Sequence, residues 1–184
     1  MSSRTNLTIV AVALAFGLGG FAASRWLFAP SPAAPAVVST DPVAIGERYR
    51  DATLPDLDGN PRRFSDWDGR VRLVNYWATW CAPCVREMPM LDQYARAHPD
   101  VVVIGIAMDD PAAARAFATR LGIGYPLLSE VPSRTDSSVG FGNTRGVLPY
   151  SVLIDASGTV RAAEAGDFAD LAELEAFVAR SNAR

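Results

Sequence analysis

The sequence has no surplus of basic residues. Its 184 residues include 17 basic and 20 acidic side chains, giving a net charge of −3 and a pI near 5.1. Proteins that bind nucleic acid use a cationic surface to neutralise phosphates. The composition therefore argues against nucleic-acid binding. Hydrophobic residues make up 49% of the chain, which is too apolar for a disordered protein and predicts a packed fold.

Metal ligands are also scarce. The chain contains two cysteines, Cys81 and Cys84, and one histidine, His98. If a helix continued unbroken from Cys84, His98 would lie about 21 Å along its axis. Because a zinc or copper site needs further ligands near the cysteines, the pattern argues against a metal centre. We expect no metal and no cofactor.

The N-terminal segment differs from the rest of the chain. Residues 7–23 carry no charge, and Arg25 and Trp26 follow them. With the interfacial residues up to Phe28, the stretch approaches the roughly 20 residues that span a bilayer. We predict a transmembrane anchor over residues 1–28. A cleaved signal peptide is the alternative, since Gly20-Phe21-Ala22 offers small residues to a peptidase, but the apolar run is longer than usual for such a peptide.

Residues 29–50 are predicted to be a linker and residues 51–184 a single domain. The beginning of the linker, Ala-Pro-Ser-Pro-Ala-Ala-Pro, favours extended polyproline conformation and offers little to bury. It would hold the following domain clear of the membrane. A simply disordered segment is the alternative.

The domain alternates strand and helix patterns, with no internal repeat. Continuous apolar runs predict strands buried on both faces, separated by a helix. Turn residues 58–60 predict a short hairpin, and a proline at the start with a glycine after the end predicts a helix over 111–121. The result is an α/β fold with a mixed sheet and a closing amphipathic helix. The strands are expected at 71–77, 101–107, 150–154 and 159–164, and the closing helix at 171–178.

The two cysteines follow the first buried strand at the start of the next helix. Residues three apart at a helix start face the same side and come close enough for a disulfide. Backbone N–H groups and the helix dipole would stabilise a thiolate at Cys81, so we expect it to attack and Cys84 to resolve. Pro83 fits the first helical turn and stiffens the loop. A purely structural disulfide is the alternative, although closing so short a loop stabilises a protein least.

The segment Leu73 to Pro89, Leu-Val-Asn-Tyr-Trp-Ala-Thr-Trp-Cys-Ala-Pro-Cys-Val-Arg-Glu-Met-Pro, resembles the active-site region of membrane-anchored thiol-disulfide oxidoreductases of the TlpA and ResA type. The resemblance covers about residues 54–177. It implies a thioredoxin fold of the AhpC/TSA or redoxin-like kind, with an N-terminal hairpin and an extra βα segment around 108–128. It also implies that Pro149 is cis and faces the cysteines, with Leu148 offering backbone to substrate. An ordinary proline at a strand start is the alternative.

Asn75 stands six residues before Cys81, where thioredoxins carry a buried aspartate. Because an amide cannot titrate, the proton-transfer group must lie elsewhere. Glu87 lies three residues beyond Cys84 on the same helical face, and the resemblance implies that it tunes the thiols. A solvated surface glutamate is the alternative.

Other residues are expected to contact substrate. Trp80, next to Cys81, would shield the sulfur and form part of a docking surface, with core packing as the alternative. Pro83 and Leu148 complete the predicted contact set. Residues 131–146 are left open between a substrate-contacting loop and a helix boundary.

The expected activity is thiol-disulfide exchange through a mixed disulfide, without a cofactor. Compartment and resemblance together favour a reductase in the periplasm, tethered to the bacterial inner membrane through residues 7–28. It would be recharged by a transmembrane thiol electron donor and would reduce exported clients such as apocytochrome c or copper-site cysteines. An oxidant or isomerase is one alternative. A non-catalytic copper-binding or redox-gated adaptor module is the other.

Overall fold

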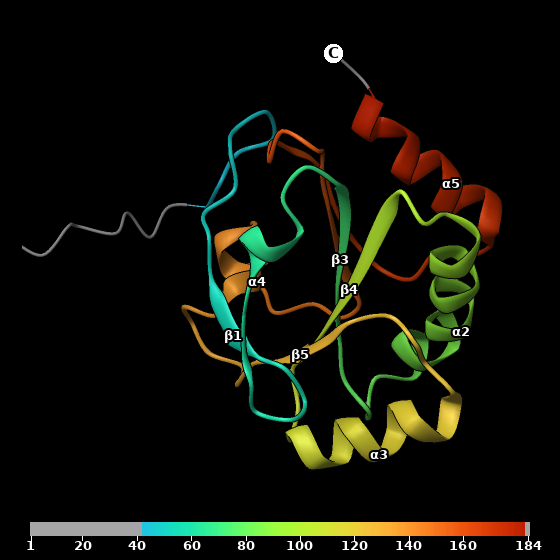
Figure 1. Cartoon of the computed structure of the whole chain (residues 1–184). Helices are drawn as coiled ribbons and strands as arrows, with labels where there is room; N and C mark the ends of the chain where they lie inside the picture. The colour runs from blue at the N-terminus through green and yellow to red at the C-terminus, as the bar shows by residue number, and fades with distance from the viewer. Residues whose placement is uncertain (1–41, 183–184) are drawn as a thin grey trace, which may run out of the picture. The chain divides into compact units, whose positions relative to one another are not determined.

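The computed structural model describes residues 42–182 (Figure 1). The predicted membrane segment and the first part of the predicted linker lie outside these residues. Within the described range, no helix is both long and apolar enough to cross a bilayer.

A five-stranded mixed sheet forms the centre of the domain, as predicted. Its strand order is β5-β4-β3-β6-β7, in which β4 runs parallel to β3 and β5, while β6 and β7 are antiparallel to their neighbours. The predicted bounds of β3, β4 and β6 are confirmed. The strands are β3 (Val71–Trp77), β4 (Val101–Ala107), β5 (Leu127–Ser129), β6 (Tyr150–Ile154) and β7 (Val160–Ala165).

Apolar clusters cover both faces of the sheet, which explains the continuous apolar runs in β3 and β4. Side chains alternate between the faces along each strand. Leu73 of β3 points into the cluster that includes helix residue Leu91, while Val74 points into the opposite cluster with Phe64.

Helices α2 and α5 lie on one side of β3 and β4, and the N-terminal hairpin and α4 lie on the other (Figure 1). Helix α3 begins and ends where predicted, because the Asp110 side chain caps its first turn and Gly122 ends it in the left-handed conformation at φ 69°. The helices are α2 (Ala82–Ala97), α3 (Pro111–Leu121), α4 (Ser137–Gly140) and α5 (Leu171–Ala179), with 3-10 turns η1 (Phe64–Trp67) and η2 (Arg180–Asn182).

The predicted hairpin is confirmed as β1 (Thr53–Pro55) and β2 (Pro61–Arg63). The Asp56 side chain holds its turn by accepting hydrogen bonds from the backbone N–H groups of Asp58 and Asn60. An isolated β-bridge between Asp56 and Leu128 joins the hairpin to β5, the edge strand of the main sheet.

The predicted boundary between linker and domain is wrong. Val43 and Tyr49, assigned to the linker, are only 7% and 6% exposed and belong to the core. The backbone of residues 46–49 also exchanges hydrogen bonds with the chain at Gly158 and Val160. The packed domain therefore includes residues 43–50, because two buried side chains and an added edge pairing outweigh the weak local preference of this segment.

Candidate active site

Cys81 and Cys84 form a disulfide at the start of α2, with their Cα atoms 5.3 Å apart. Cys81 is the N-cap of the helix, and its sulfur accepts a hydrogen bond from the Cys84 backbone N–H at 3.3 Å. Pro83 lies in the first turn, as predicted. When the disulfide opens, this N–H group and the positive end of the helix dipole stabilise negative charge on the Cys81 sulfur.

The surroundings of the two sulfurs are unequal. Cys84 is completely buried, whereas Cys81 retains 5% exposure and follows Trp80, which is 69% exposed. The structure therefore contradicts core packing as the reason for Trp80. Because the exposed indole lies beside the less buried sulfur, a partner protein can reach the dithiol from the Cys81 side.

Asp109 fixes the turn that leads into the dithiol. It follows β4, the parallel neighbour of β3, and accepts hydrogen bonds from the Thr79 backbone N–H at 3.0 Å and from the Thr79 hydroxyl. These hydrogen bonds keep the pKa of Asp109 below its usual range, although its partial burial opposes them. Sequence reasoning missed this residue. Its position at the carboxyl end of the neighbouring strand was the available signal.

The peptide bond between Leu148 and Pro149 is cis, as the resemblance implied. Pro149 is buried, and half-buried Leu148 packs against the apolar cluster that contains both cysteines. Asn143 holds the preceding loop through two hydrogen bonds with Val147, both at 2.9 Å. Its side-chain oxygen accepts one from the Val147 N–H, and its side-chain amide donates the other to the Val147 carbonyl oxygen. Part of segment 131–146, whose role the sequence did not decide, therefore supports the Leu148–Pro149 turn.

Glu87 is buried in the interior, with 2% of its surface exposed, which contradicts the solvated alternative. One carboxyl oxygen accepts a hydrogen bond from the Asn75 amide at 2.7 Å, and the other accepts one from the Phe168 backbone N–H at 3.2 Å. Burial raises the pKa of Glu87 to about 7, and the nearby charge of Asp167 adds to this rise, while the two hydrogen bonds oppose it. Glu87 can therefore gain or lose a proton near neutral pH.

Asn75 connects this carboxyl group to the sheet. Its amide also donates to the Ser151 hydroxyl on neighbouring β6 at 3.1 Å, and its own oxygen has no hydrogen-bond partner among the described residues. The sequence indicated Asn75 and Glu87 separately. It gave no sign of Ser151 or Phe168, which lie 64 and 81 residues further along the chain than Glu87.

His98 has a local structural role. It ends α2, its ring stacks on Tyr94 with the ring centroids 4.0 Å apart, and its Nδ1 lies 3.0 Å from the Tyr94 carbonyl oxygen. Over residues 42–182, no three His, Cys, Asp or Glu side chains gather as a metal site would require.

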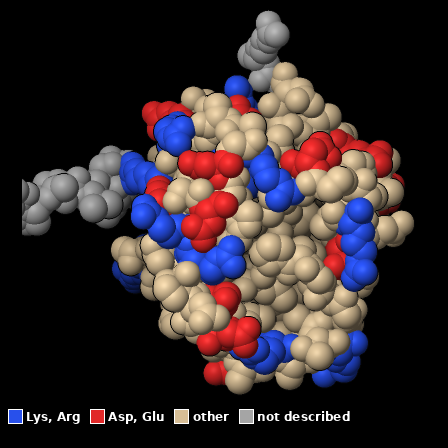
Figure 2. Space-filling view, in the orientation of Figure 1, with Lys and Arg blue, Asp and Glu red and all other residues tan. Residues whose placement is uncertain are grey.

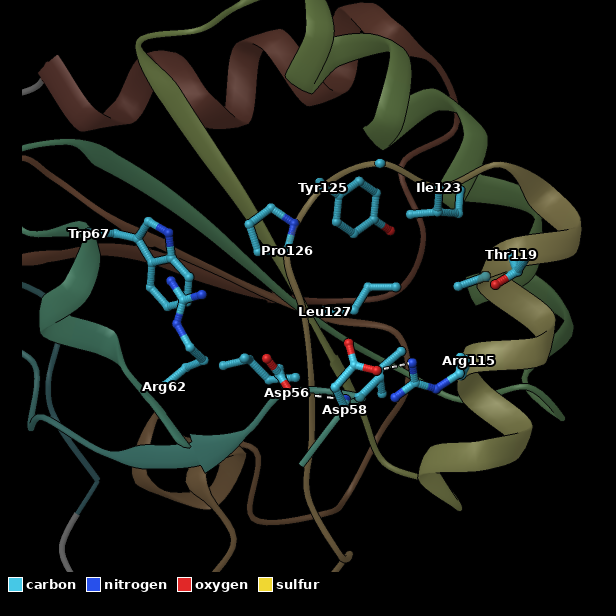
Figure 3. A pocket seen from close by; sticks show the side chains of 14 residues that line it. Asp56, Asp58, Arg62, Trp67, Arg115, Thr119, Ile123, Tyr125, Pro126 and Leu127 are labelled. Atoms are coloured by element: carbon cyan, nitrogen blue, oxygen red, sulfur yellow. Dashed lines mark hydrogen bonds and ion pairs between the residues drawn. The ribbon is translucent and has the colours of Figure 1, made fainter. Parts of the chain in front are cut away.

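A pocket of about 390 Å³ lies between the hairpin, α3 and the chain that enters β5 (Figure 3). Asp58 and Arg115 form an ion pair at its rim, and the ring of Tyr125 forms part of its wall. Neither cysteine lines it, so the dithiol chemistry belongs to the surface around Trp80 and not to this pocket.

Figure 2 shows acidic and basic side chains interspersed on the visible face, without an extended patch of one sign.

Comparisons with known proteins agree with this geometry. Residues 45–163 match the model of the AhpC/TSA family. The chain is 32% identical to the thiol-disulfide oxidoreductase ResA of Geobacillus kaustophilus over 123 residues, which cover 65% of this chain and 68% of that protein.

Solved structures show the same thioredoxin-like fold. A thiol:disulfide interchange protein of the thioredoxin family from Chlorobium tepidum superposes with a TM-score of 0.65 at 26% identity, covering 75% of this chain and 97% of that one. A secreted Mycobacterium tuberculosis disulfide oxidoreductase, homologous to E. coli DsbE, superposes with a TM-score of 0.57 at 25% identity, covering 72% and 96%.

Proposed function

Because the chain belongs to the AhpC/TSA family and is a thiol-disulfide oxidoreductase of the ResA type, we propose that it reduces disulfides of exported proteins through Cys81 and Cys84. The observation that carries this proposal is the dithiol at the start of α2, with Cys84 fully buried and Cys81 beside exposed Trp80. Attack by Cys81 and resolution by Cys84 follow from this difference in access.

The reaction transfers two electrons from the dithiol to the client. The Cys81 thiolate attacks one sulfur of the client disulfide, so that the client S–S bond breaks and a mixed disulfide forms. The released client sulfur takes up a proton. Cys84 then loses its proton and attacks Cys81, which releases the second client thiolate and leaves the Cys81–Cys84 disulfide.

Glu87 is the group proposed to accept the Cys84 proton. It lies one helical turn beyond Cys84 on α2 and is buried on the sheet side of the helix. A general base works best when its pKa lies near the operating pH, and burial gives Glu87 a pKa of about 7. The neutral Asn75 at the thioredoxin aspartate position supports this assignment, because its amide cannot take the proton.

Client docking is proposed to use the surface around Cys81. Trp80 supplies an exposed aromatic ring, and Pro83 is half-buried in the first turn of α2. Leu148, before the cis proline, would pair its backbone with an extended client segment. Aromatic side chains of this kind commonly anchor protein contacts.

The domain is proposed to act in the periplasm, tethered to the inner membrane through residues 7–28. The long apolar run and the proline-rich stretch after it support this location, and one structural relative is described as secreted. In an oxidising compartment the disulfide must be reduced again by electrons from across the membrane, so we assign a transmembrane thiol protein as donor. Proteins of cytochrome c maturation or copper-site assembly are the proposed clients.

Trapping of the mixed disulfide tests the proposal. The full-length Cys84→Ser variant, expressed in its host, is expected to accumulate disulfide-linked client complexes, because the resolving thiol is absent. The Cys81→Ser variant is the matched control and should capture none. If Cys84→Ser captures no partner, or if both variants capture the same set, disulfide reduction through Cys81 is wrong.

The direction of the reaction needs a separate measurement. Equilibrating the protein with glutathione or dithiothreitol buffers gives its reduction potential. A reductase is expected to have a potential nearer to that of thioredoxin, about −270 mV, than to that of the oxidant DsbA, about −120 mV. A value near the latter would assign the protein to disulfide formation instead.

A further inference from the structure

The loop of residues 166–170, between β7 and α5, joins two parts of the site. The Gly166 backbone N–H donates a hydrogen bond to the Pro149 carbonyl oxygen at 2.9 Å. Two residues later, the Phe168 N–H donates to Glu87, and the buried Phe168 ring packs against Phe177 with centroids 5.2 Å apart. The loop therefore runs from the cis proline to the carboxyl group beneath the dithiol.

An ion pair fastens the same two segments on their solvent side. Arg86, next to Glu87 on α2, places its Nη2 atom 3.0 Å from the Asp167 carboxylate, and Asp167 directly precedes Phe168. The two side chains are 66% and 35% exposed, whereas Glu87 is only 2% exposed. The outer ion pair thus lies over the inner hydrogen bond between Phe168 and Glu87.

We propose that Arg86 and Asp167 are positioning residues, which hold the 166–168 segment closed over the Glu87 carboxyl group and keep water away from it. The inference rests on the role proposed above for Glu87. It deepens that role, because it assigns the control of Glu87 to residues that contact neither the sulfurs nor the client.

Several charged or titratable groups face Glu87. The charge of Asp167 acts on Glu87 from the loop, while Arg86, the preceding residue on α2, pairs with Asp167 and not with Glu87. Cys84 and Cys81 precede Glu87 by three and six residues at the start of the same helix. Tyr125 approaches from the chain before β5; burial raises the pKa of its hydroxyl, and the charge of Glu87 adds to this rise. None of these groups brings a buried cation to the carboxylate. Exclusion of water is therefore the main reason that the proton stays on Glu87 near neutral pH.

The test is Arg86→Gln, which removes the ion pair and keeps a side chain of similar length. In the oxidised protein, whose cysteines do not titrate, a carbon-13 NMR titration should show the pKa of Glu87 falling by about half a unit, because the entry of water outweighs the opposite effect of the unpaired Asp167 charge. Hydrogen exchange at the Phe168 N–H should become about two- to fivefold faster, the range that an exposed ion pair supports.

Two further variants complete the design. Arg86→Lys keeps the charge and is expected to restore both values in part. Arg63→Gln is the control, because it breaks an ion pair of similar exposure at the hairpin. The side chains of that pair, Arg63 and Asp51, are 63% and 28% exposed, and their separation should change neither the pKa of Glu87 nor the exchange at Phe168. If Arg86→Gln folds and leaves the Glu87 titration and the Phe168 exchange unchanged, the proposal is wrong.

Alkylation of Cys81 in the reduced protein separates this inference from the proposed function. Arg86→Gln should shift the pH profile of alkylation in the wild-type background and have no further effect in a Glu87→Gln background. If Glu87→Gln itself leaves the profile unchanged while the NMR titration still responds to Arg86→Gln, the ion pair controls Glu87 but Glu87 does not control the thiols.

Discussion

Two charged side chains are buried on opposite faces of β3 and have opposite surroundings. Arg72, near the start of the strand, is completely buried, and partners surround the end of its guanidinium group, although its Nε has no hydrogen-bond partner among the described residues. It donates to the Asp68 carboxylate at 2.7 Å and to the Phe64 carbonyl oxygen at 3.1 Å, and its guanidinium lies 4.5 Å from the centroid of the Tyr49 ring. Glu87, on the other face, accepts hydrogen bonds from two neutral donors and has no cationic partner among residues 42–182.

This difference in surroundings distinguishes a charge that stabilises the fold from a carboxyl group that can take part in proton transfer. A buried charge with an opposite charge and several hydrogen bonds stays ionised and fastens the elements that surround it. A buried carboxyl group without a cation holds its proton to higher pH, so it can exchange that proton during catalysis. Arg72 thus fastens η1 to the sheet, while Glu87 serves the dithiol.

The largest expected effect is on stability, at Arg72. Arg72→Met keeps the length of the side chain but removes the donor to the Phe64 carbonyl oxygen and one of the partners of Asp68, which keeps the Tyr49 hydroxyl. We expect a loss of about 2–4 kcal/mol in the free energy of unfolding, measured by urea denaturation. The pH profile of Cys81 alkylation should not change. Arg134→Met, at an exposed loop position, is the control; a shifted alkylation profile in Arg72→Met alone would show that the two faces are coupled.

The second effect is the pH dependence contributed by Glu87. Its folded-state pKa of about 7 lies above the ordinary value of 4.5, so the folded protein binds the proton more tightly than the unfolded chain. Stability from this group is present below pH 4.5 and is lost as the pH rises to 7, by about 3 kcal/mol in all. Glu87→Gln should remove this decline in urea denaturation between pH 4 and 8. Exposed Glu175→Gln should retain it, and a decline that persists in Glu87→Gln would mean that another group titrates.

A smaller effect is expected at Asn75. Asn75→Leu keeps the side-chain shape but removes the amide that donates to the Glu87 carboxylate and lowers its pKa. The pKa of Glu87 should therefore rise by about one unit, measured by carbon-13 NMR on the oxidised protein. Ser151→Ala removes the other partner of Asn75 and should shift the pKa less. A fall in the pKa of Glu87 in Asn75→Leu would contradict this account.

The smallest effect is expected at Asp68, whose side chain is 42% exposed. Asp68→Asn keeps an oxygen that can accept from Arg72 and from the Tyr49 hydroxyl, and water replaces part of the lost attraction. We expect a loss of about 1 kcal/mol at neutral pH, by urea denaturation. The hydrogen bonds from Tyr49 and Arg72 lower the pKa of Asp68 against the effect of burial, so the loss should vanish as the pH falls through the folded-state value. A loss as large as that of Arg72→Met would show that the ion pair, and not the burial of Arg72, fastens this face.

Much of the fold could be predicted because its signals are local. Strands β3 and β4 are apolar along their whole length, and α3 carries its own start and stop residues, so their bounds agree with the structure. The segment of residues 43–50 could not be assigned in the same way. Its inclusion depends on Val43 and Tyr49 meeting a core built by strands more than twenty residues further along.

The candidate site shows the same division. The sequence by itself determined the dithiol, because a strand, a turn and a helix start follow one another in about fourteen residues, and it indicated Glu87 by helical spacing. Only the tertiary structure decided that Glu87 is buried away from water and accepts hydrogen bonds from Asn75 and Phe168. It also decided that Asp109 fixes the turn before Cys81. Burial and hydrogen bonding between distant segments depend on how the sheet and helices pack, and no local pattern records that packing.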